Sequence, residues 1–300
     1  MLSVFLDMPL KFLKKLYESL PVIRELRSTN LLLQNISDAV EAIGTLEMTR
    51  LQDLELKAHS RYGSPKRLTR YEAKINSQNG EDGILQEIFK RIGVTNRFFI
   101  EIGVADGFEC NTAFLLSQGW KGAWIDGSAA FQSLIDSKPD LRGRLKGLQS
   151  FVTRENISEL LKKVETPAEL DLLSLDIDRN TYYAWEGLKE FRPRVICIEY
   201  NSVVPPDREW KLEYGSKLTW DGTNNYGASL KSMELLGASR GYALVGCDFN
   251  GVNAFFVRSD LIDDKFEGPF TAENHYEPPR FALARLRKAH RPTILDSAGN

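Results

Sequence analysis

Acidic and amide side chains close two apolar stretches of this sequence. Asp176 and Asp178 end one stretch, and Glu199 and Asn201 end the next. Their oxygens are the ligands that a hard cation such as Mg²⁺ prefers. Without a metal, like charges in one cleft raise the pKa of one carboxyl, which suits a general base. We therefore predict a metal site or a proton-abstracting site here, with helix capping by Asp178 and Asn180 as the structural alternative.

A glycine-rich turn stands earlier in the chain, in the segment Glu101-Ile-Gly-Val-Ala-Asp-Gly. Gly103, Ala105 and Gly107 would let the backbone approach a ligand closely. A helix predicted from Asn111 would point its free N–H groups at the same place. The spacing lacks the glycines of the dinucleotide fingerprint, which argues against a nicotinamide cofactor. Turn formation alone is the other explanation for these residues.

Asp126 ends the apolar stretch that follows this turn. A carboxylate at such a strand end can accept hydrogen bonds from both hydroxyls of a ribose. A glycine turn followed by an acidic strand end therefore predicts a ligand that contains adenosine. The alternative is that Asp126 caps the helix expected after Gly127.

Apolar strands and amphipathic helices alternate from residue 77 onward. This alternation predicts an α/β fold with a Rossmann-like, doubly wound, mostly parallel sheet of seven strands and an antiparallel edge hairpin. In such sheets ligands bind outside the carboxyl ends of the strands, where the acidic residues stand. The expected strands are 98–103, 122–126, 148–152, 170–178, 194–200, 242–247 and 254–258. The expected helices are 79–92, capped by Asn79 and ended by Gly93, and 111–117, 156–164, 181–191 and 228–240.

Residues 1–60 are expected to form a separate helical arm, before a domain over 61–300 that ends in a basic tail. Residues 10–20 predict a basic amphipathic helix, which packs on its own domain or rests on a partner or an anionic membrane surface. A near-heptad seam follows, and Glu47 and Arg50 interrupt it. The seam predicts a weak two-stranded coiled coil or self-associating arm, and hence a homo-oligomer. Its apolar members are Leu33, Ile36, Val40, Ile43 and Leu54.

Composition narrows the class of protein. The 300 residues carry 39 Lys and Arg against 41 Asp and Glu, a net charge of −2, which argues against a nucleic-acid partner. Cys110, Cys197 and Cys247 form no CxxC pair, so they predict core residues rather than a zinc site. Free cysteines favour the cytoplasm, and the arm leaves open a peripheral contact with the inner membrane face.

Several of these segments together resemble class I S-adenosylmethionine-dependent methyltransferases. More narrowly, they are similar to the FkbM-type group found among glycan and natural-product biosynthesis proteins. The resemblance covers about residues 70–262. The segments are Ser77-Gln-Asn-Gly-Glu-Asp-Gly, the Glu101 turn, Leu175-Asp-Ile-Asp-Arg-Asn, Ile198-Glu-Tyr-Asn, Trp220-Asp-Gly-Thr and Gly246-Cys-Asp-Phe-Asn-Gly-Val-Asn-Ala-Phe-Phe.

The resemblance implies S-adenosylmethionine as cofactor. The glycine turn would cradle its methionine part with Glu101 beneath, Asp126 would bind the ribose, and Val152 and Thr153 would flank the adenine. Arg179 stands where the FkbM-type group usually has Gly, a departure from the group at the lip of the site. The full set of expected cofactor-binding residues is Gln78, Glu81, Glu101, Gly103, Ala105, Asp106, Gly107, Asp126, Val152 and Thr153.

The chemistry implied is methyl transfer to an oxygen, with a hydroxyl of a sugar in a glycan or nucleotide-sugar as the acceptor. A hydroxyl must lose its proton, so a base or a metal is required. Asp178 is the first candidate base, Glu199 the second, and His275 the third. The acidic cluster also loosely resembles the Mg²⁺ site of catechol-type O-methyltransferases. A non-catalytic oligomeric scaffold in a glycan-assembly complex is the alternative function.

Overall fold

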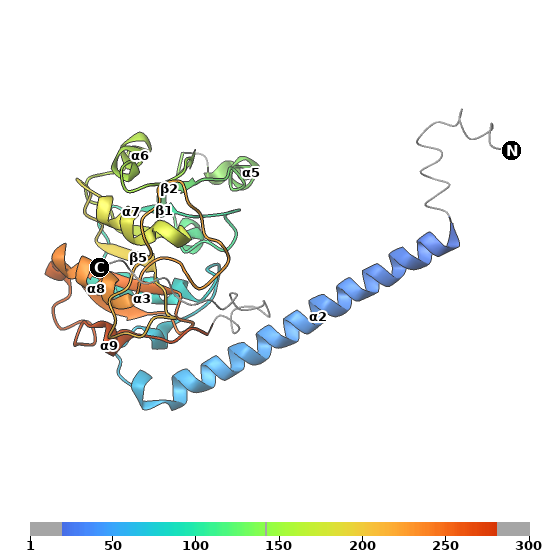
Figure 1. Ribbon diagram of the computed structural model, residues 1–300, viewed down its shortest axis with the longest axis horizontal. Helices are drawn as coiled ribbons and strands as arrows, with labels where there is room; N and C mark the ends of the chain where they lie inside the picture. Colours follow the sequence, from blue (N-terminus) through green and yellow to red (C-terminus); the bar gives the residue numbers. More distant parts are fainter. Residues whose placement is uncertain (1–19, 142, 281–300) are drawn as a thin grey trace. The chain divides into compact units, whose positions relative to one another are not determined.

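The structure, a computed structural model, describes residues 20–141 and 143–280 (Figure 1). The chain divides into two units, Met1–Arg50 and Leu51–Asn300. Helix α2, Pro21–Ala58, carries the predicted heptad seam, whose apolar side chains are exposed. The basic amphipathic helix predicted before it, apart from Leu20, and the basic tail after Arg280 lie outside the described residues. Within the described ranges, no helix combines the length and apolarity needed to cross a bilayer.

One mixed sheet of seven strands organises the second unit, in the order β3-β2-β1-β4-β5-β7-β6. The first five strands run parallel to one another, and β7 runs antiparallel between β5 and β6. This confirms the Rossmann-like sheet and the antiparallel pair at its edge. The strands are β1 Phe98–Ile102, β2 Lys121–Asp126, β3 Leu145–Gln149, β4 Leu172–Leu175, β5 Val195–Glu199, β6 Tyr242–Cys247 and β7 Asn253–Arg258.

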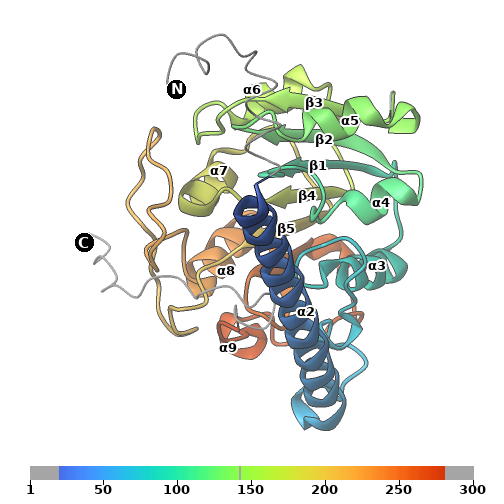
Figure 2. The same cartoon turned by 90° about the vertical axis from the view of Figure 1, so that its right-hand side faces the viewer.

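Helices cover both faces of the sheet, as its buried apolar strands require. Alternate residues of each strand enter two separate cores. Helices α3 (Glu81–Ile92), α4 (Ala113–Ser117) and α5 (Gln132–Ser137) close one core. Helices α6 (Ile157–Lys163), α7 (Thr181–Gly187) and α8 (Leu230–Ser239) close the other, and Figure 2 shows the two sets on opposite sides. The short helix α9, Ala272–His275, packs on α8 and β6.

Several predicted boundaries are wrong, and two of them have a clear local reason. Pairing of Gly122 with Leu145 and of Asp126 with Gln149 sets β3 level with β2, so the predicted strand 148–152 starts and ends too late. Its last three residues, Ser150, Phe151 and Val152, therefore lie beyond the sheet. Asn79 does not cap α3, because Gly80 holds the cap position with a left-handed φ of 95°.

The three cysteines are free and buried, as predicted for core residues. Cys197 and Cys247 have no exposed surface, and Cys110 has almost none. Burial raises the pKa of each thiol well above its ordinary value, so none of them is a reactive thiolate.

Candidate functional site

A cleft of about 210 Å³ opens at the carboxyl ends of β1, β2, β3 and β4. It is the place where a sheet of this kind binds ligands. We call it the strand-end cleft, and five chain segments line it. Four of them follow strands: Ile102 and Gly103; Asp126 and Gly127; Ser150, Phe151 and Val152; and Asp176, Ile177, Asp178 and Asn180. The fifth is the part of the long β5–α8 connection with Leu218, Thr219 and Trp220.

The glycine turn meets this cleft beside β1 through Gly103. Gly103, Ala105 and Gly107 all have positive φ, at 87°, 50° and 86°. A Cβ at Gly103 would stand 1.5 Å from the carbonyl oxygen of Asp176, so the two turns touch through backbone alone. A Cβ at Gly107 would meet the ring of Trp124 at 2.7 Å. Both glycines are therefore required by packing, and only Gly103 lines the cleft.

Gly103→Ala is expected to destabilise the protein strongly. The added methyl overlaps a carbonyl that cannot move without shifting the acidic turn, and the residue must keep a left-handed φ. A loss of about 3 kcal/mol or more in the free energy of unfolding is the scale for such overpacking combined with backbone strain. Denaturant titration of the variant measures it. Gly119→Ala is the matched control, since Gly119 has the same φ sign and open space around it.

Asp126 holds the glycine turn in place. Its Oδ2 accepts hydrogen bonds from the N–H of Val104 at 2.9 Å and of Ala105 at 3.0 Å, and its Oδ1 accepts from Ser128 at 2.6 Å. Helix α5 starts only at Gln132, so Asp126 caps a turn and not a helix. A carboxylate offers about four lone-pair sites. Asp126 lines the cleft with one of them left for a ligand hydroxyl.

Glu101 lies behind the glycine turn and not against a ligand. Its carboxylate accepts hydrogen bonds from the N–H groups of Asn111 and Thr112 at 2.8 and 3.0 Å and from the Thr112 hydroxyl. The N–H groups expected to face a ligand at the start of α4 are therefore already used, which corrects that prediction. Burial raises the pKa of Glu101 to about 7, although these hydrogen bonds oppose the shift.

The raised pKa of Glu101 predicts that stability falls as pH rises. The folded protein binds a proton at Glu101 up to about pH 7, whereas the unfolded chain releases it near 4.5. The free energy of unfolding should therefore drop between these values, by up to about 1.4 kcal/mol per pH unit from this group. Guanidinium titrations at several pH values measure the slope, and Glu101→Gln should flatten it. An unchanged slope in that variant would assign the dependence to other groups.

The acidic cluster predicted from the sequence forms in part. Asp176, Asp178 and Glu199 bring one carboxylate oxygen each within 4.8 Å of one another. Burial and then the charge of Asp178 raise the pKa of Asp176 to about 7. Burial and then the charge of Asp176 raise the pKa of Glu199 well above its usual range. Both shifts favour the protonated form of the carboxyl, and the Oε2 of Glu199 has no hydrogen-bond partner.

Asp178 is the most exposed of the three and has a left-handed φ of 56°. It begins the short 3₁₀ turn η5, Asp178–Asn180, which leads into α7. The predicted strand 170–178 ends at Leu175, so Asp176 and Asp178 belong to a turn. Neither Asp178 nor Asn180 caps a helix through its side chain.

Asn201 is not part of the cluster. Its amide nitrogen donates to the carbonyl oxygens of Asn224 and Tyr226, and its Oδ1 accepts from the N–H of Val203. These bonds hold the Asn201 side chain within the β5–α8 connection. Of the four residues predicted as a metal site, the three carboxylates lie at the spacing of metal ligands.

His275 does not suit a catalytic base. It is 1% exposed at the end of α9, and it does not line the strand-end cleft. Burial and then the charge of Arg67 lower its pKa to about 3, so the imidazole stays neutral at physiological pH. It packs in the core as an uncharged side chain.

Several residues that were expected to contact the cofactor form hydrogen bonds with other parts of the protein. Glu81 is fully buried and accepts from Asn79 and from the Asn253 amide, which ties the start of α3 to β7. Thr153 and Asn156 exchange hydrogen bonds before α6. Neither Glu81 nor Thr153 lines the cleft, whereas Val152 does. Two further predicted contacts, Gln78 and Asp106, also lie outside its lining.

Phe151, Asn180 and Trp220 are among the lining residues that are not predicted to bind a ligand. Phe151 is 45% exposed at the lip of the cleft, directly before Val152. The sequence holds a signal for it, since an apolar aromatic side chain stands at the end of a predicted strand. Asn180 is predicted only as a cap. Trp220 comes from a connection about thirty residues long between β5 and α8, and no local pattern shows where such a segment folds back.

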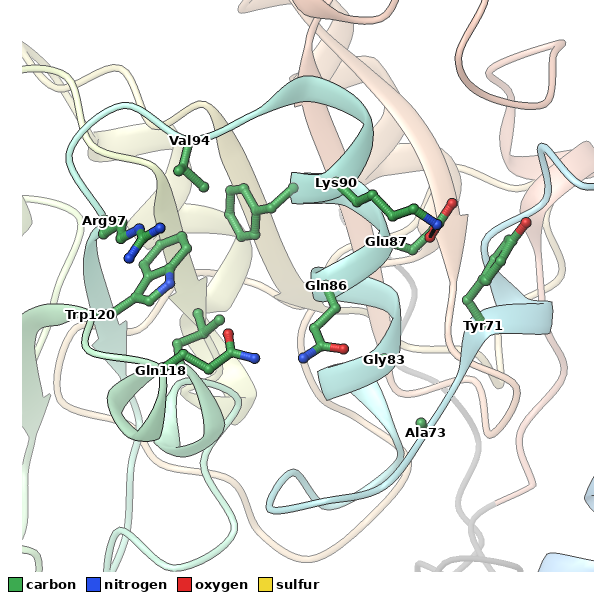
Figure 3. Close-up of a pocket in the computed structure, with 12 residues that line it drawn as sticks. Tyr71, Ala73, Gly83, Gln86, Glu87, Lys90, Val94, Arg97, Gln118 and Trp120 are labelled. Atoms are coloured by element: carbon green, nitrogen blue, oxygen red, sulfur yellow. Dashed lines mark hydrogen bonds and ion pairs between the residues drawn. The ribbon is translucent and has the colours of Figure 1, made fainter.

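A larger cavity of about 640 Å³ lies on the α3–α4 side. It is lined by Val94, Arg97 and Trp120, which precede β1 and β2, so it opens away from the carboxyl ends of the strands. Figure 3 shows Gln86 and Gln118 facing each other across it. Among the residues that the structure describes, one cluster of acids has the spacing of metal ligands. It consists of Asp176, Asp178 and Glu199, at the strand-end cleft.

Comparisons with known proteins give distant likenesses only. No family model matches the sequence, and no curated protein matches it. Among solved structures, a 1,6-didemethyltoxoflavin-N1-methyltransferase from Burkholderia thailandensis with bound S-adenosylhomocysteine has 11% identity and a TM-score of 0.38, over 72% of this chain and 87% of its own. The glycopeptide N-methyltransferase MtfA, in complex with S-adenosylmethionine, has 13% identity and a TM-score of 0.34, over 62% and 89%. A Staphylococcus aureus protein assigned as a caffeoyl-CoA O-methyltransferase has 15% identity and a TM-score of 0.42, and the match covers 71% of this chain and 99% of that protein.

By its strand order, with β7 between β5 and β6, this chain has an α/β Rossmann-like fold with a cleft at the carboxyl ends of its parallel strands.

Proposed function

We propose that this protein is an S-adenosylmethionine-dependent methyltransferase. The observation that carries the proposal is the pairing of Asp126 with the glycine turn at the strand-end cleft. One lone pair of Asp126 would accept a ribose hydroxyl, and the exposed ring of Phe151 would pack on the adenine. When bound, the cofactor supplies a methyl group already activated on a sulfonium.

The cofactor fits these residues with one requirement. Ligand pockets usually span about 300–1,000 Å³. The cleft has about 210 Å³, and the β5–α8 connection closes it through Leu218 and Trp220. This connection must therefore move outward to admit the cofactor, as closing segments of enzymes do.

The proposed acceptor is an oxygen, and a hydroxyl of a sugar is the proposed acceptor class. A hydroxyl must be deprotonated as the methyl group arrives. Asp178 is the most exposed acid at the cleft and lies next to Asp176 and Glu199, so we assign to it the removal of the proton. Asp176 and Glu199 would then position Asp178, and their raised pKa values would limit the negative charge around it.

Mg²⁺ is a second candidate for activating the hydroxyl. It is favoured by the spacing of the three carboxylates and by the unpartnered Oε2 of Glu199. A bound cation would lower the pKa of the acceptor hydroxyl.

Calorimetric titration with S-adenosylhomocysteine tests the function, first with Mg²⁺ and then with EDTA. Micromolar binding is expected in at least the first condition. Binding followed by methyl transfer to members of a nucleotide-sugar panel would support the acceptor class. No binding in either condition would overturn the proposal and favour the oligomeric scaffold.

A further inference from the structure

Asn253 presents a buried amide oxygen at the edge of the sheet that carries the acidic cluster. The residue begins β7 and is 3% exposed. Its Nδ2 donates to the Oε1 of Glu81 at 2.8 Å, and its Oδ1 has no hydrogen-bond partner. Buried acceptors without a partner are costly and therefore rare in folded proteins.

The buried carboxylate of Glu81 fixes the orientation of this amide. A carboxylate accepts hydrogen bonds, so the Nδ2 of Asn253 must face Glu81 and the Oδ1 must face away from it. Glu81 is held in turn by Asn79, whose N–H and Nδ2 donate to it at 2.8 and 3.0 Å. The unpaired atom of Asn253 is therefore its oxygen, and this oxygen is available to a ligand.

The order of the strands brings this oxygen to the acidic cluster. Strands β4, β5 and β7 are neighbours in that order, and β7 runs antiparallel to β5. The first residue of β7 thus lies at the carboxyl end of β5, where Asn253 pairs directly with Glu199. The Cβ atoms of residues paired in this way lie about 4.5–5.5 Å apart.

The side chains of Glu199 and Asn253 project from the same face of the sheet. Two residues away along each strand, Cys197 and Phe255 also pair with each other, and both enter the core beneath α3, α4 and α5. Side chains alternate along a strand, so Glu199 and Asn253 lie on that face too. The bond from Asn253 to Glu81, in the first turn of α3, agrees with this placement.

This pairing sets two unpartnered acceptors side by side. The Oε2 of Glu199, like the Oδ1 of Asn253, has no hydrogen-bond partner. Asp176 and Asp178 each bring a carboxylate oxygen within 4.8 Å of one from Glu199. Within the part of the chain that the structure describes, no Lys or Arg forms an ion pair with Asp176 or Glu199. Oxygens that only accept cannot bond to one another, so this group of them calls for a cation.

From this arrangement we propose that Asn253 Oδ1 is an amide ligand of a divalent cation such as Mg²⁺, held together with Asp176, Asp178 and Glu199. Carboxylate and amide oxygens are the ligands of such hard cations. Glu81 is then a positioning residue, because it turns the amide oxygen toward the ion, as the outer partners of metal ligands do. The role of the ion in methyl transfer rests on the proposed function, whereas its binding does not.

Titration of the full chain with Mn²⁺ tests the site, and the electron paramagnetic resonance signal of the free ion measures binding. Mn²⁺ serves as the probe because it takes the oxygen ligands of Mg²⁺. The wild type should bind one ion per chain, and Mg²⁺ should displace it. Asn253→Ala should bind Mn²⁺ about 10- to 100-fold more weakly, the loss usual when a group that supports a metal site is removed.

Asn250→Ala is the matched control. Asn250 is also 3% exposed with an unpartnered Oδ1, and its Nδ2 donates to Asn79. It lies in the turn between β6 and β7, outside the pairing with Glu199, so its affinity for Mn²⁺ should equal that of the wild type. No bound Mn²⁺ in the wild type, wild-type affinity in Asn253→Ala, or equal losses in the two variants overturns the inference.

A second pair of variants serves if Asn253→Ala does not fold. Asn253→Asp adds a negative charge beside the acids, so Mg²⁺ should raise its unfolding temperature, relative to EDTA, by more than that of the wild type. The reason is that a ligand of the folded state stabilises that state. Asn250→Asp should respond to Mg²⁺ as the wild type does. A response of Asn253→Asp that is no larger than that of the wild type overturns the inference.

Titration with S-adenosylhomocysteine keeps this inference apart from the proposed function. Binding of S-adenosylhomocysteine by a protein that binds no Mn²⁺ overturns the cation site and leaves the proposed methyltransferase with Asp178 as its base. Binding of Mn²⁺ with the expected loss in Asn253→Ala supports the cation site, even where the absence of S-adenosylhomocysteine binding overturns the proposed function.

Discussion

Replacing Asp126 by Ala is expected to weaken the binding of S-adenosylhomocysteine by at least 100-fold. The variant loses the carboxylate that would accept the hydrogen bond of the ribose. A hydrogen bond to a charged group contributes about 1.5–3 kcal/mol to the free energy of binding. It also releases the N–H groups of Val104 and Ala105, so the glycine turn is no longer held in its left-handed conformation. The two losses act on the same ligand, and we expect their effects to combine. Calorimetric titration measures the dissociation constant.

Asp126→Asn separates the two roles. An asparagine Oδ1 can still accept from the two N–H groups of the turn, but it carries no charge for the ribose. This variant should bind about tenfold more weakly than the wild type. Asp106→Asn is the control, because Asp106 lies on the same turn, is exposed and only accepts from Phe108. Wild-type affinity in Asp126→Ala would contradict the cofactor site.

Asp178→Asn is expected to lower the rate of methyl transfer by about 10²- to 10⁴-fold, the usual contribution of a general base. The amide keeps the shape of the carboxylate but cannot take a proton. Affinity for S-adenosylhomocysteine should change little, because Asp126 and the glycine turn remain intact. The measurement is release of S-adenosylhomocysteine during turnover with a nucleotide-sugar acceptor.

The matched control is Asp140→Asn, an exposed aspartate that follows the α5 helix and whose ion pair with Arg144 is weak at 3.5 Å. It should keep the wild-type rate. A rate that EDTA abolishes in the wild type would assign the role of Asp178 to a metal ligand. If Asp178→Asn kept the wild-type rate, Asp178 would not be the general base.

The sheet is predictable because its signals are local. Each strand is a short apolar run with a turn signal at its end, and parallel pairing of neighbours follows from the helices between them. For the same reason the amino-acid sequence suffices to place Asp126, Asp176, Asp178 and Glu199 at one edge of the sheet. Residues at the ends of parallel strands converge whatever their detailed geometry.

The partners of the site residues are not predictable in this way. Glu101, Glu81 and Asn201 are polar residues next to the expected site, yet their oxygens accept hydrogen bonds from backbone and amide donors of other turns or of their own loop. His275 lies in a segment with a loop-like sequence, and it is buried by contacts that no pattern encodes. Whether an acid faces a ligand or a neighbouring N–H depends on loop conformation, which the spacing of residues does not specify.

The contact between Gly103 and the carbonyl of Asp176 has a consequence for protein engineering. Because no side chain separates the two turns, a shift in either backbone moves the other. Cofactor affinity and the placement of the acids therefore cannot be tuned by separate substitutions in these turns. The β5–α8 connection contributes Leu218 and Trp220 to the cleft from a different part of the chain. New acceptor preferences should consequently be sought by varying that connection, with the two turns left unchanged.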